Sequence, residues 1–416
     1  MRLLSIDGGG LAGLIPAEAL IEIENQLDAL TGRSLPLCDR FDLIGGTSTG
    51  AILAVGLSLG LKAAELRDFY LKFGKQIFAK VFLPERFWHS YPSGPLEQHL
   101  KDVFEEDTTL GSSKLRTNIL IVSKNVTLGT TWFFTNNPKG KYFTNNRGLP
   151  LWQIVRASSA APTYFPPQTI SVPDDEGQPQ EYEFIDGGVS SYNNPSMQVF
   201  LEATDPNYQF GWPTGTGKLL LLSLGTGFNA ITVRAGKASG YNLLDWARYA
   251  IKELMADANL QQNVLMHLIG QPPAGKAPTP AAEANAARAT GAPAGDALDF
   301  INPGSGASKA LTYQRITVSL TRERLDGLNL GDIDPAKVGE MDAVDQIGNF
   351  QRIGASDRQG ASQNGSAEAV LRLKSLQVSF QILATRLSRP VTQPRPQTQF
   401  SSFAIILSLH PSDYPA

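Results

Sequence analysis

The stretch LLSIDGGGLAG at residues 3–13 decides how this chain begins to fold. An apolar run is followed directly by an acid and three consecutive glycines. After this run, residues 15–32 carry apolar side chains at close to helical spacing and end on Gly32, which predicts a helix that stops there. Strand, glycine loop and helix in this order are typical of the first unit of an α/β protein.

The same unit recurs along the chain. Residues 41–46 predict a second buried strand, and residues 51–60 predict a small, apolar helix behind it. Further strands are predicted at residues 118–126, 131–136, 181–188 and 218–227. Alternating strands and helices favour a three-layer α/β/α sandwich with a mainly parallel central sheet.

Composition narrows the classes of protein that this chain can be. Its 416 residues are 42% hydrophobic and 18% charged, with a formal net charge of −3. A nucleic-acid-binding surface usually brings a basic excess, so no nucleic acid polymer is expected as a partner. The single cysteine, Cys38, excludes an internal disulfide and supplies no multi-cysteine metal site. We expect neither a metal nor a cofactor.

The opening glycines fit more than one kind of anion site. Gly8, Gly10 and Gly13 satisfy G-x-G-x-x-G, the pattern of a dinucleotide-binding loop. That interpretation also needs an acidic residue at the end of the second strand, whereas Asp42 starts that strand. Backbone N–H groups of consecutive glycines can equally face a negative charge that develops during acyl transfer.

A candidate nucleophile lies in the second strand-to-helix turn. GTSTG at residues 46–50 fits G-x-S-x-G, which exposes a serine hydroxyl above the sheet when a strand precedes it and a helix follows. Ser48 is therefore a candidate nucleophile. An ordinary helix-capping turn is the alternative interpretation of the same residues.

A serine nucleophile needs a base, and the histidines do not provide an evident one. None of the four lies where a strand passes into a loop: His89, His99, His267 and His410. Asp186 ends the predicted strand in FIDGG, and a partly desolvated carboxylate there could accept the serine proton directly. A plain Asp-Gly-Gly turn is the alternative.

Four blocks, taken in order, resemble the patatin-like phospholipase family: IDGGGLAG, GTSTG, ASSAAPTYFPP (157–167) and FIDGGVSSYNNP (184–195). LLLSLGTG at 220–227 extends the resemblance. The family implies an α/β/α fold related to cytosolic phospholipases and a Ser-Asp dyad that needs no metal. By motif, Ser48 would be the nucleophile, Asp186 the proton acceptor and the N–H groups of Gly8, Gly9 and Gly10 the oxyanion hole. The remaining motif glycines are Gly13, Gly46, Gly50, Gly187 and Gly188.

One position departs from the family pattern. Family members commonly carry Arg or Lys just before the last glycine of the first motif, and this chain has Ala12. The change removes a cation that would anchor the loop or contact an anionic headgroup, but it leaves the backbone donors in place.

The resemblance also suggests a domain division. We expect a catalytic domain over residues 1–345, with its motif-bearing core at 3–200, and a C-terminal extension over 346–416. Ala, Pro and Gly dominate residues 272–295, which predicts a mobile insertion. Within the extension, a helix is predicted at about 366–387, followed by a loose tail.

Aromatic residues form two groups outside the motifs. Tyr164 and Phe165 could line an acyl-chain channel or belong to the core. The stretch 69–91 mixes rings with cations, which is typical of a lipid-facing patch and also of an amphipathic helix packed on the sheet. Its aromatic residues are Phe69, Tyr70, Phe73, Phe78, Phe82, Phe87, Trp88 and Tyr91, and its cations are Lys72, Lys75, Lys80 and Arg86.

Together these features predict a phospholipase A-type lipid acyl hydrolase that contacts membrane glycerolipids transiently. The first strand begins near Arg2, and the apolar run 403–409 is far shorter than the roughly 20 residues of a spanning helix, so a cytoplasmic protein, peripheral at most, is expected. Two alternatives stay open. One is an antiphage phospholipase gated by a small-molecule activator such as a cyclic nucleotide, and the other is a non-catalytic lipid-binding protein with the same fold.

Overall fold

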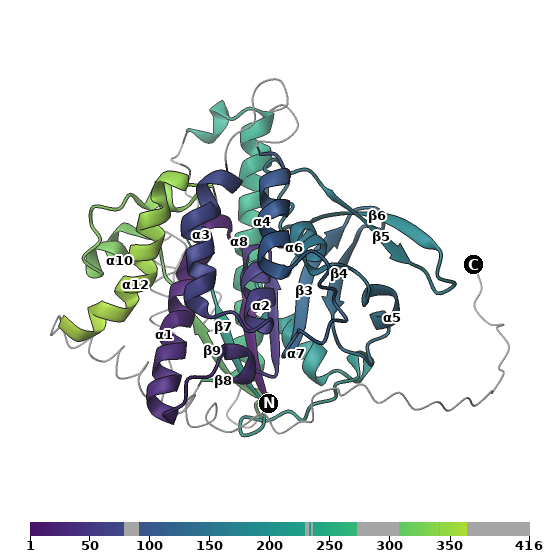
Figure 1. Cartoon of the computed structure of the whole chain (residues 1–416). Helices are drawn as coiled ribbons and strands as arrows, with labels where there is room; N and C mark the ends of the chain where they lie inside the picture. Colours follow the sequence, from purple (N-terminus) through teal and green to yellow (C-terminus); the bar gives the residue numbers. More distant parts are fainter. Residues whose placement is uncertain (79–90, 229–232, 234–235, 273–307, 341, 364–416) are drawn as a thin grey trace.

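The computed structural model describes residues 1–78, 91–228, 233, 236–272, 308–340 and 342–363 (Figure 1). Its strands are β1 (Arg2–Ile6), β2 (Leu43–Thr47), β3 (Asn118–Asn125), β4 (Thr130–Thr135), β5 (Gln168–Pro173), β6 (Pro179–Asp186), β7 (Leu220–Leu224), β8 (Gly270–Gln271) and β9 (Leu311–Ile316). Within the described residues they form one nine-stranded sheet in the order β5-β6-β3-β2-β1-β7-β9-β8, with β4 also paired to β3.

The sheet is parallel through its centre and antiparallel on one side. β1 pairs in parallel with both β2 and β7, and the parallel arrangement continues to β3 in one direction and to β9 and β8 in the other. β4, β5 and β6 join in antiparallel pairs beyond β3. The predicted α/β sandwich is therefore confirmed, with a mixed sheet at its centre.

Helices cover both faces of the sheet (Figure 1). They are α1 (Leu14–Thr31), α2 (Thr49–Ser58), α3 (Ala63–Ile77), α4 (Gly94–Phe104), α5 (Phe143–Asn146), α6 (Leu151–Ser158), α7 (Ser196–Thr204), α8 (Leu243–Ile269), α10 (Arg322–Gly327), α11 (Pro335–Val338) and α12 (Ile347–Gln363). Successive side chains of a strand point to opposite faces, so β1 contributes Leu4 to one core and Leu3 to another. The first core, called the main core below, includes residues of α1 to α4. The second core includes Val199 of α7 and Met266 of α8.

Two predicted helices occur where their local signals place them. α1 ends at Thr31 and is capped by Gly32, whose φ of +61° is the left-handed conformation that glycine adopts without steric cost. All the residues of α2 are buried, as expected for a helix that is apolar on every side. α2 lies between the sheet and neighbouring helices, and its first turn carries the residues next to Ser48.

α12 packs beside α1 although it begins just past the predicted domain boundary (Figure 1). Ile347, Phe350 and Ile353 of α12 belong to the same hydrophobic core as α1. The predicted division at residue 345 stays a prediction. The helix predicted at 366–387 lies outside the described residues, as does the predicted insertion apart from its first residue, Pro272.

Within the described ranges, no helix combines the length and the apolar character needed to cross a lipid bilayer.

Candidate active site

Strand register brings Ser48 and Asp186 to the same level of the sheet. Thr47, the last residue of β2, is paired with Val122 of β3, and the next residue of β3, Ser123, is paired with Asp186 at the end of β6. Only β3 separates the two strand ends. Ser48, the residue after β2, donates a hydrogen bond of 2.6 Å from its Oγ to Asp186 Oδ2.

Ser48 occupies a sharp turn between β2 and α2. Its φ of +55° and ψ of −122° are rare for a residue with a side chain, and its hydroxyl makes no capping bond to α2. The flanking glycines permit this turn, since a Cβ on Gly46 would lie 2.2 Å from the carbonyl oxygen of Gly50. A Cβ on Gly50 would lie 2.2 Å from the carbonyl oxygen of Ile6. The Ser48 hydroxyl therefore does not cap α2, and its role as a nucleophile stays a prediction.

The Asp186 carboxylate is buried and held on both oxygens. Oδ1 accepts the Gly188 N–H at 2.7 Å, while Oδ2 accepts the Ser48 hydroxyl. Burial raises the pKa of Asp186 to about 6, and the hydrogen bonds from Ser48 and Gly188 and the charge of Arg156 limit that rise. A carboxylate with this pKa is ionised at neutral pH and still able to accept a proton.

Arg156 places a buried positive charge near the dyad. It lies on α6, where its Nη2 donates to the carbonyl oxygen of Pro166 at 2.9 Å. Its Nε is 3.5 Å from Glu97 Oε1. Burial lowers the pKa of Arg156 to about 10, while Glu97 opposes that shift, so the guanidinium stays charged at neutral pH.

The glycine loop after β1 lies beside Ser48 and Asp186, because Gly10 lines the same pocket as these two residues. The Gly8 N–H donates to the carbonyl oxygen of Asn193 at 3.1 Å, so its hydrogen is engaged inside the protein. This bond removes Gly8 from the expected set of oxyanion donors. In the described part of the chain, the N–H groups of Gly9 and Gly10 donate to no other residue. Gly10 has a φ of +59°, which turns the loop as only glycine does freely.

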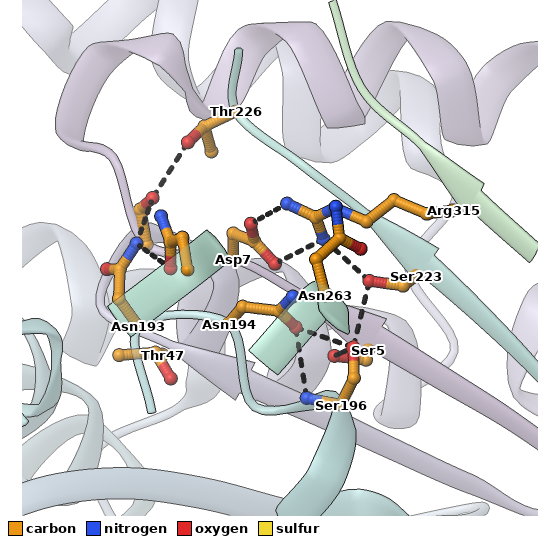
Figure 2. A network of polar contacts seen from close by, with 12 residues as sticks. Ser5, Asp7, Thr47, Asn193, Asn194, Ser196, Ser223, Thr226, Asn263 and Arg315 are labelled. Atoms are coloured by element: carbon orange, nitrogen blue, oxygen red, sulfur yellow. Dashed lines mark hydrogen bonds and ion pairs between the residues drawn. The ribbon is translucent and has the colours of Figure 1, made fainter. Parts of the chain in front are cut away.

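Polar side chains from distant strands hold this loop (Figure 2). Thr226, just after β7, donates its hydroxyl to the carbonyl oxygen of Gly8 at 2.7 Å. Arg315 of β9 forms a two-pronged ion pair with Asp7, with Nη2 2.5 Å from Oδ2 and Nη1 3.1 Å from Oδ1. Arg315 Nη1 also donates to Ser223 Oγ at 2.7 Å.

An apolar pocket adjoins the hydrogen-bonded pair of Ser48 and Asp186. Ser48 and Asp186 line it together with Leu11, Ile52, Phe69, Ile77, Tyr164 and Phe165. Phe165 lines the pocket and also belongs to the main core, while Tyr164 lines the pocket and packs against that core. An acyl-chain channel at these residues stays a prediction. Three aromatic residues of the predicted lipid-facing patch, Phe69, Tyr70 and Tyr91, are buried in the main core and do not face outward. Residues 79–90, which hold Phe82, Phe87 and Trp88, lie outside the described residues, so that part of the patch stays a prediction.

Ala12 is the position that departs from the family pattern, and its backbone N–H donates to the carbonyl oxygen of Gly9 at 3.2 Å. Ala12 lies in a short 3-10 turn, Gly10–Gly13, that links the glycine loop to α1. It is 8% exposed and belongs to the main core. A longer cationic side chain at this position would start from an apolar environment.

Neither described histidine pairs with Ser48. His99 is hydrogen-bonded to Gln76 at 3.0 Å and stacks on Phe73, and Nδ1 of His267 contacts the carbonyl oxygen of Asn263 at 2.8 Å. His89 and His410 lie outside the described residues. Among the residues that the structure describes, no cluster of His, Cys, Asp or Glu side chains is arranged to hold a metal ion.

Sequence reasoning missed the residues that support the loop. Asn193 and Thr226 lie within the motif blocks FIDGGVSSYNNP and LLLSLGTG, but their contacts with Gly8 depend on folding. Arg315 carries no local signal, since a single arginine in a strand is usually a solvent-facing residue. Its position opposite Ser223, and thus near Asp7, follows from strand order and register.

Sequence comparisons with known proteins point to one family. The sequence profile of the patatin-like phospholipase family matches residues 4–200. Patatin-like protein 2 of Arabidopsis thaliana is 32% identical over 292 residues, a match that covers 62% of this chain and 68% of that protein. Patatin-17 of Solanum cardiophyllum is 30% identical over 271 residues, covering 59% and 66%. The chain thus spans about two thirds of the length of these relatives.

Among solved structures, VipD from Legionella pneumophila is similar with a TM-score of 0.32 and 11% identity, over 84% of this chain and 66% of that one. The profile match and the relatives at about 30% identity agree on a single family. This chain belongs to the patatin-like phospholipase family.

Proposed function

We propose that this protein is a lipid acyl hydrolase that cleaves carboxylic esters of membrane glycerolipids. One observation carries the proposal: Ser48 Oγ donates a 2.6 Å hydrogen bond to the buried Asp186 carboxylate, and both residues line an apolar pocket. Family membership supports the reaction class. The apolar lining fits a fatty acyl chain, whose burial contributes favourable free energy for each methylene.

In the acylation step, Ser48 Oγ attacks the ester carbonyl carbon and its proton passes to Asp186 Oδ2. The carbonyl oxygen becomes negative, and the N–H groups of Gly9 and Gly10 are available to donate to it. The tetrahedral intermediate then collapses as the ester C–O bond breaks. Asp186 returns the proton to the leaving alcohol oxygen, and the acyl group remains on Ser48.

In the deacylation step, water attacks the acyl-enzyme carbonyl while Asp186 accepts a proton from that water. The bond between Ser48 Oγ and the acyl carbon breaks, the proton returns to Ser48, and a free fatty acid leaves. One carboxylate therefore serves as base and acid in turn. The pKa of about 6 suits this alternation, because Asp186 begins each step ionised at neutral pH.

The test is loss of both covalent labelling and lipolysis in Ser48→Ala. We expect the wild-type protein to react with a fluorophosphonate probe and to release fatty acid from phosphatidylcholine and phosphatidylglycerol vesicles, measured by mass spectrometry. Ser48→Ala should lose both signals, because the probe and the ester both need the nucleophilic oxygen.

Ser58→Ala is the matched control, since Ser58 is a buried serine at the other end of the same helix. It should retain labelling and fatty acid release. Equal release by Ser48→Ala and wild type would refute the proposal. Folded wild-type protein that takes up no probe and releases no fatty acid would favour a non-catalytic lipid-binding role.

A further inference from the structure

An arginine beyond the matched family region pairs with the residue that precedes the glycine loop. Arg315 is on β9, outside residues 4–200. The register aligns Ser5 of β1 with Ser223 of β7, and Ser223 with Arg315, so the three residues form a row across the sheet. From the end of this row, the guanidinium reaches the carboxylate of Asp7 (Figure 2).

The ion pair between Arg315 and Asp7 is closed to solvent. The two side chains are 8% and 2% exposed. Both oxygens of Asp7 are engaged by the guanidinium, which is the two-pronged geometry that gives an arginine pair its directionality. Burial raises the pKa of Asp7, and the charge of Arg315 opposes that rise. Neither group could be removed alone without leaving an uncompensated charge in the interior.

This ion pair acts at the residue that precedes the oxyanion loop. Asp7 is followed by Gly8, Gly9 and Gly10, which have no side chains with which to fix their own positions. The loop conformation must therefore be set from outside. Asn193 and Thr226 hold the Gly8 peptide, while Arg315 holds the side chain of Asp7.

We propose that Arg315 is a positioning residue that, through Asp7, aims the Gly9 and Gly10 amides at the reacting carbonyl oxygen. This inference rests on the proposed hydrolase function. Without the guanidinium, Asp7 becomes a buried carboxylate with no cation, and it must take up a proton or admit water. Either change shifts the start of the glycine loop.

Loss of Arg315 should lower kcat and leave KM nearly unchanged. The oxyanion exists only in the transition state, so misplaced amides lower kcat and leave ground-state binding nearly unchanged. A displacement of about 1 Å at a catalytic group can cost roughly 100-fold in rate. For Arg315→Met we expect kcat to fall about 30- to 100-fold, with KM for p-nitrophenyl butyrate within about twofold of wild type.

Three further variants separate positioning from folding. Arg315→Lys keeps the charge but not the two-pronged geometry, so about a tenth of the wild-type kcat should return. Asp7→Asn combined with Arg315→Met removes both charges and should recover much of the lost Tm, yet kcat should stay low. Arg2→Met breaks a different buried pair, at the opposite end of β1 from Asp7. Arg2 is the first residue of β1, and its Nε is 3.5 Å from Oδ2 of Asp42, the residue before β2. Arg2→Met should lower Tm and keep kcat within about threefold.

Hydrogen exchange of a peptide covering residues 2–14 gives a readout independent of activity. We expect faster exchange in Arg315→Met and in the double variant than in Arg2→Met. The inference fails if the double variant folds with wild-type kcat, or if Arg2→Met loses as much kcat as Arg315→Met at equal Tm. Activity that survives in Ser48→Ala would instead defeat the proposed function, which keeps the two failures apart.

Discussion

At the scale of single residues, Asp186 combines a useful reactivity with a destabilising environment. Burial raises its pKa to about 6, so the folded protein favours the neutral carboxyl more than the unfolded chain does. The stability that Asp186 contributes is therefore fully present below its unfolded pKa and is lost as pH rises through the folded pKa. At neutral pH the protein holds this carboxylate ionised at a cost to folding.

Asp186→Asn should therefore raise stability while it abolishes activity. The amide resembles the neutral carboxyl, so we expect a gain of about 1 to 3 kcal/mol at pH 8 that disappears below about pH 4. Thermal unfolding at the two pH values measures the gain. A loss of stability at pH 8 would contradict the origin of the pKa shift.

Glu202 provides a control for this effect. It is a buried carboxyl on α7 that accepts a hydrogen bond from Thr135, and burial raises its pKa to about 7. Glu202→Gln should also be more stable than wild type at pH 8, because the sign of the shift is the same. Its kcat should be unchanged, whereas Asp186→Asn should have none.

The pH dependence of the reaction follows from the same carboxylate. Asp186 must be ionised to accept the serine proton, so kcat/KM of the free enzyme should fall below about pH 6 with the slope of a single titrating group. A profile that stays flat down to pH 4 would contradict Asp186 as the base. Initial rates with a soluble ester between pH 4 and 8 provide the measurement.

At the scale of elements, the β2–α2 turn depends on close backbone contact. A Cβ on Gly50 would lie 2.2 Å from the carbonyl oxygen of Ile6, which belongs to β1 and cannot move without disturbing the sheet. Gly50→Ala should therefore destabilise the protein by about 3 kcal/mol and misplace Ser48. Chemical denaturation and probe labelling together report both effects.

Gly348 is the matched position for comparison. It lies on α12 and is exposed, and a Cβ added there would meet no atom within 4 Å outside its own stretch of helix. Gly348→Ala should be neutral or stabilising by up to about 1 kcal/mol, since alanine favours helix. Equal destabilisation by the two substitutions would show that the turn has no special requirement for glycine.

At the scale of the whole molecule, α12 completes the core over α1. Phe350 is fully buried there between Ile347 and Ile353 in sequence. Phe350→Ala should destabilise the protein by about 3 to 5 kcal/mol because it leaves a cavity in a packed core. Leu254→Ala, at a side chain that is 68% exposed on α8, should change stability by less than about 0.5 kcal/mol.

The same packing allows a test of the predicted domain division. A chain ending at residue 345 would lack Ile347, Phe350 and Ile353 of the main core and would expose the face of α1 that they cover. We expect it to have a lower Tm than the full chain. An unchanged Tm would support the division at residue 345.

Strands β5, β8 and β9 were not predicted from the sequence. The sequence alone did predict the other six strands, the position of Ser48 in a strand-to-helix turn and that of Asp186 at a strand end. These features are local, because hydrophobic periodicity and glycine requirements act over a few neighbouring residues. Three contacts could be seen only in the folded chain: Asn193 accepts the Gly8 N–H, Arg315 pairs with Asp7, and α12 joins the main core. Each of these contacts joins segments far apart in the chain, and strand register and side-chain packing set them without leaving a local pattern.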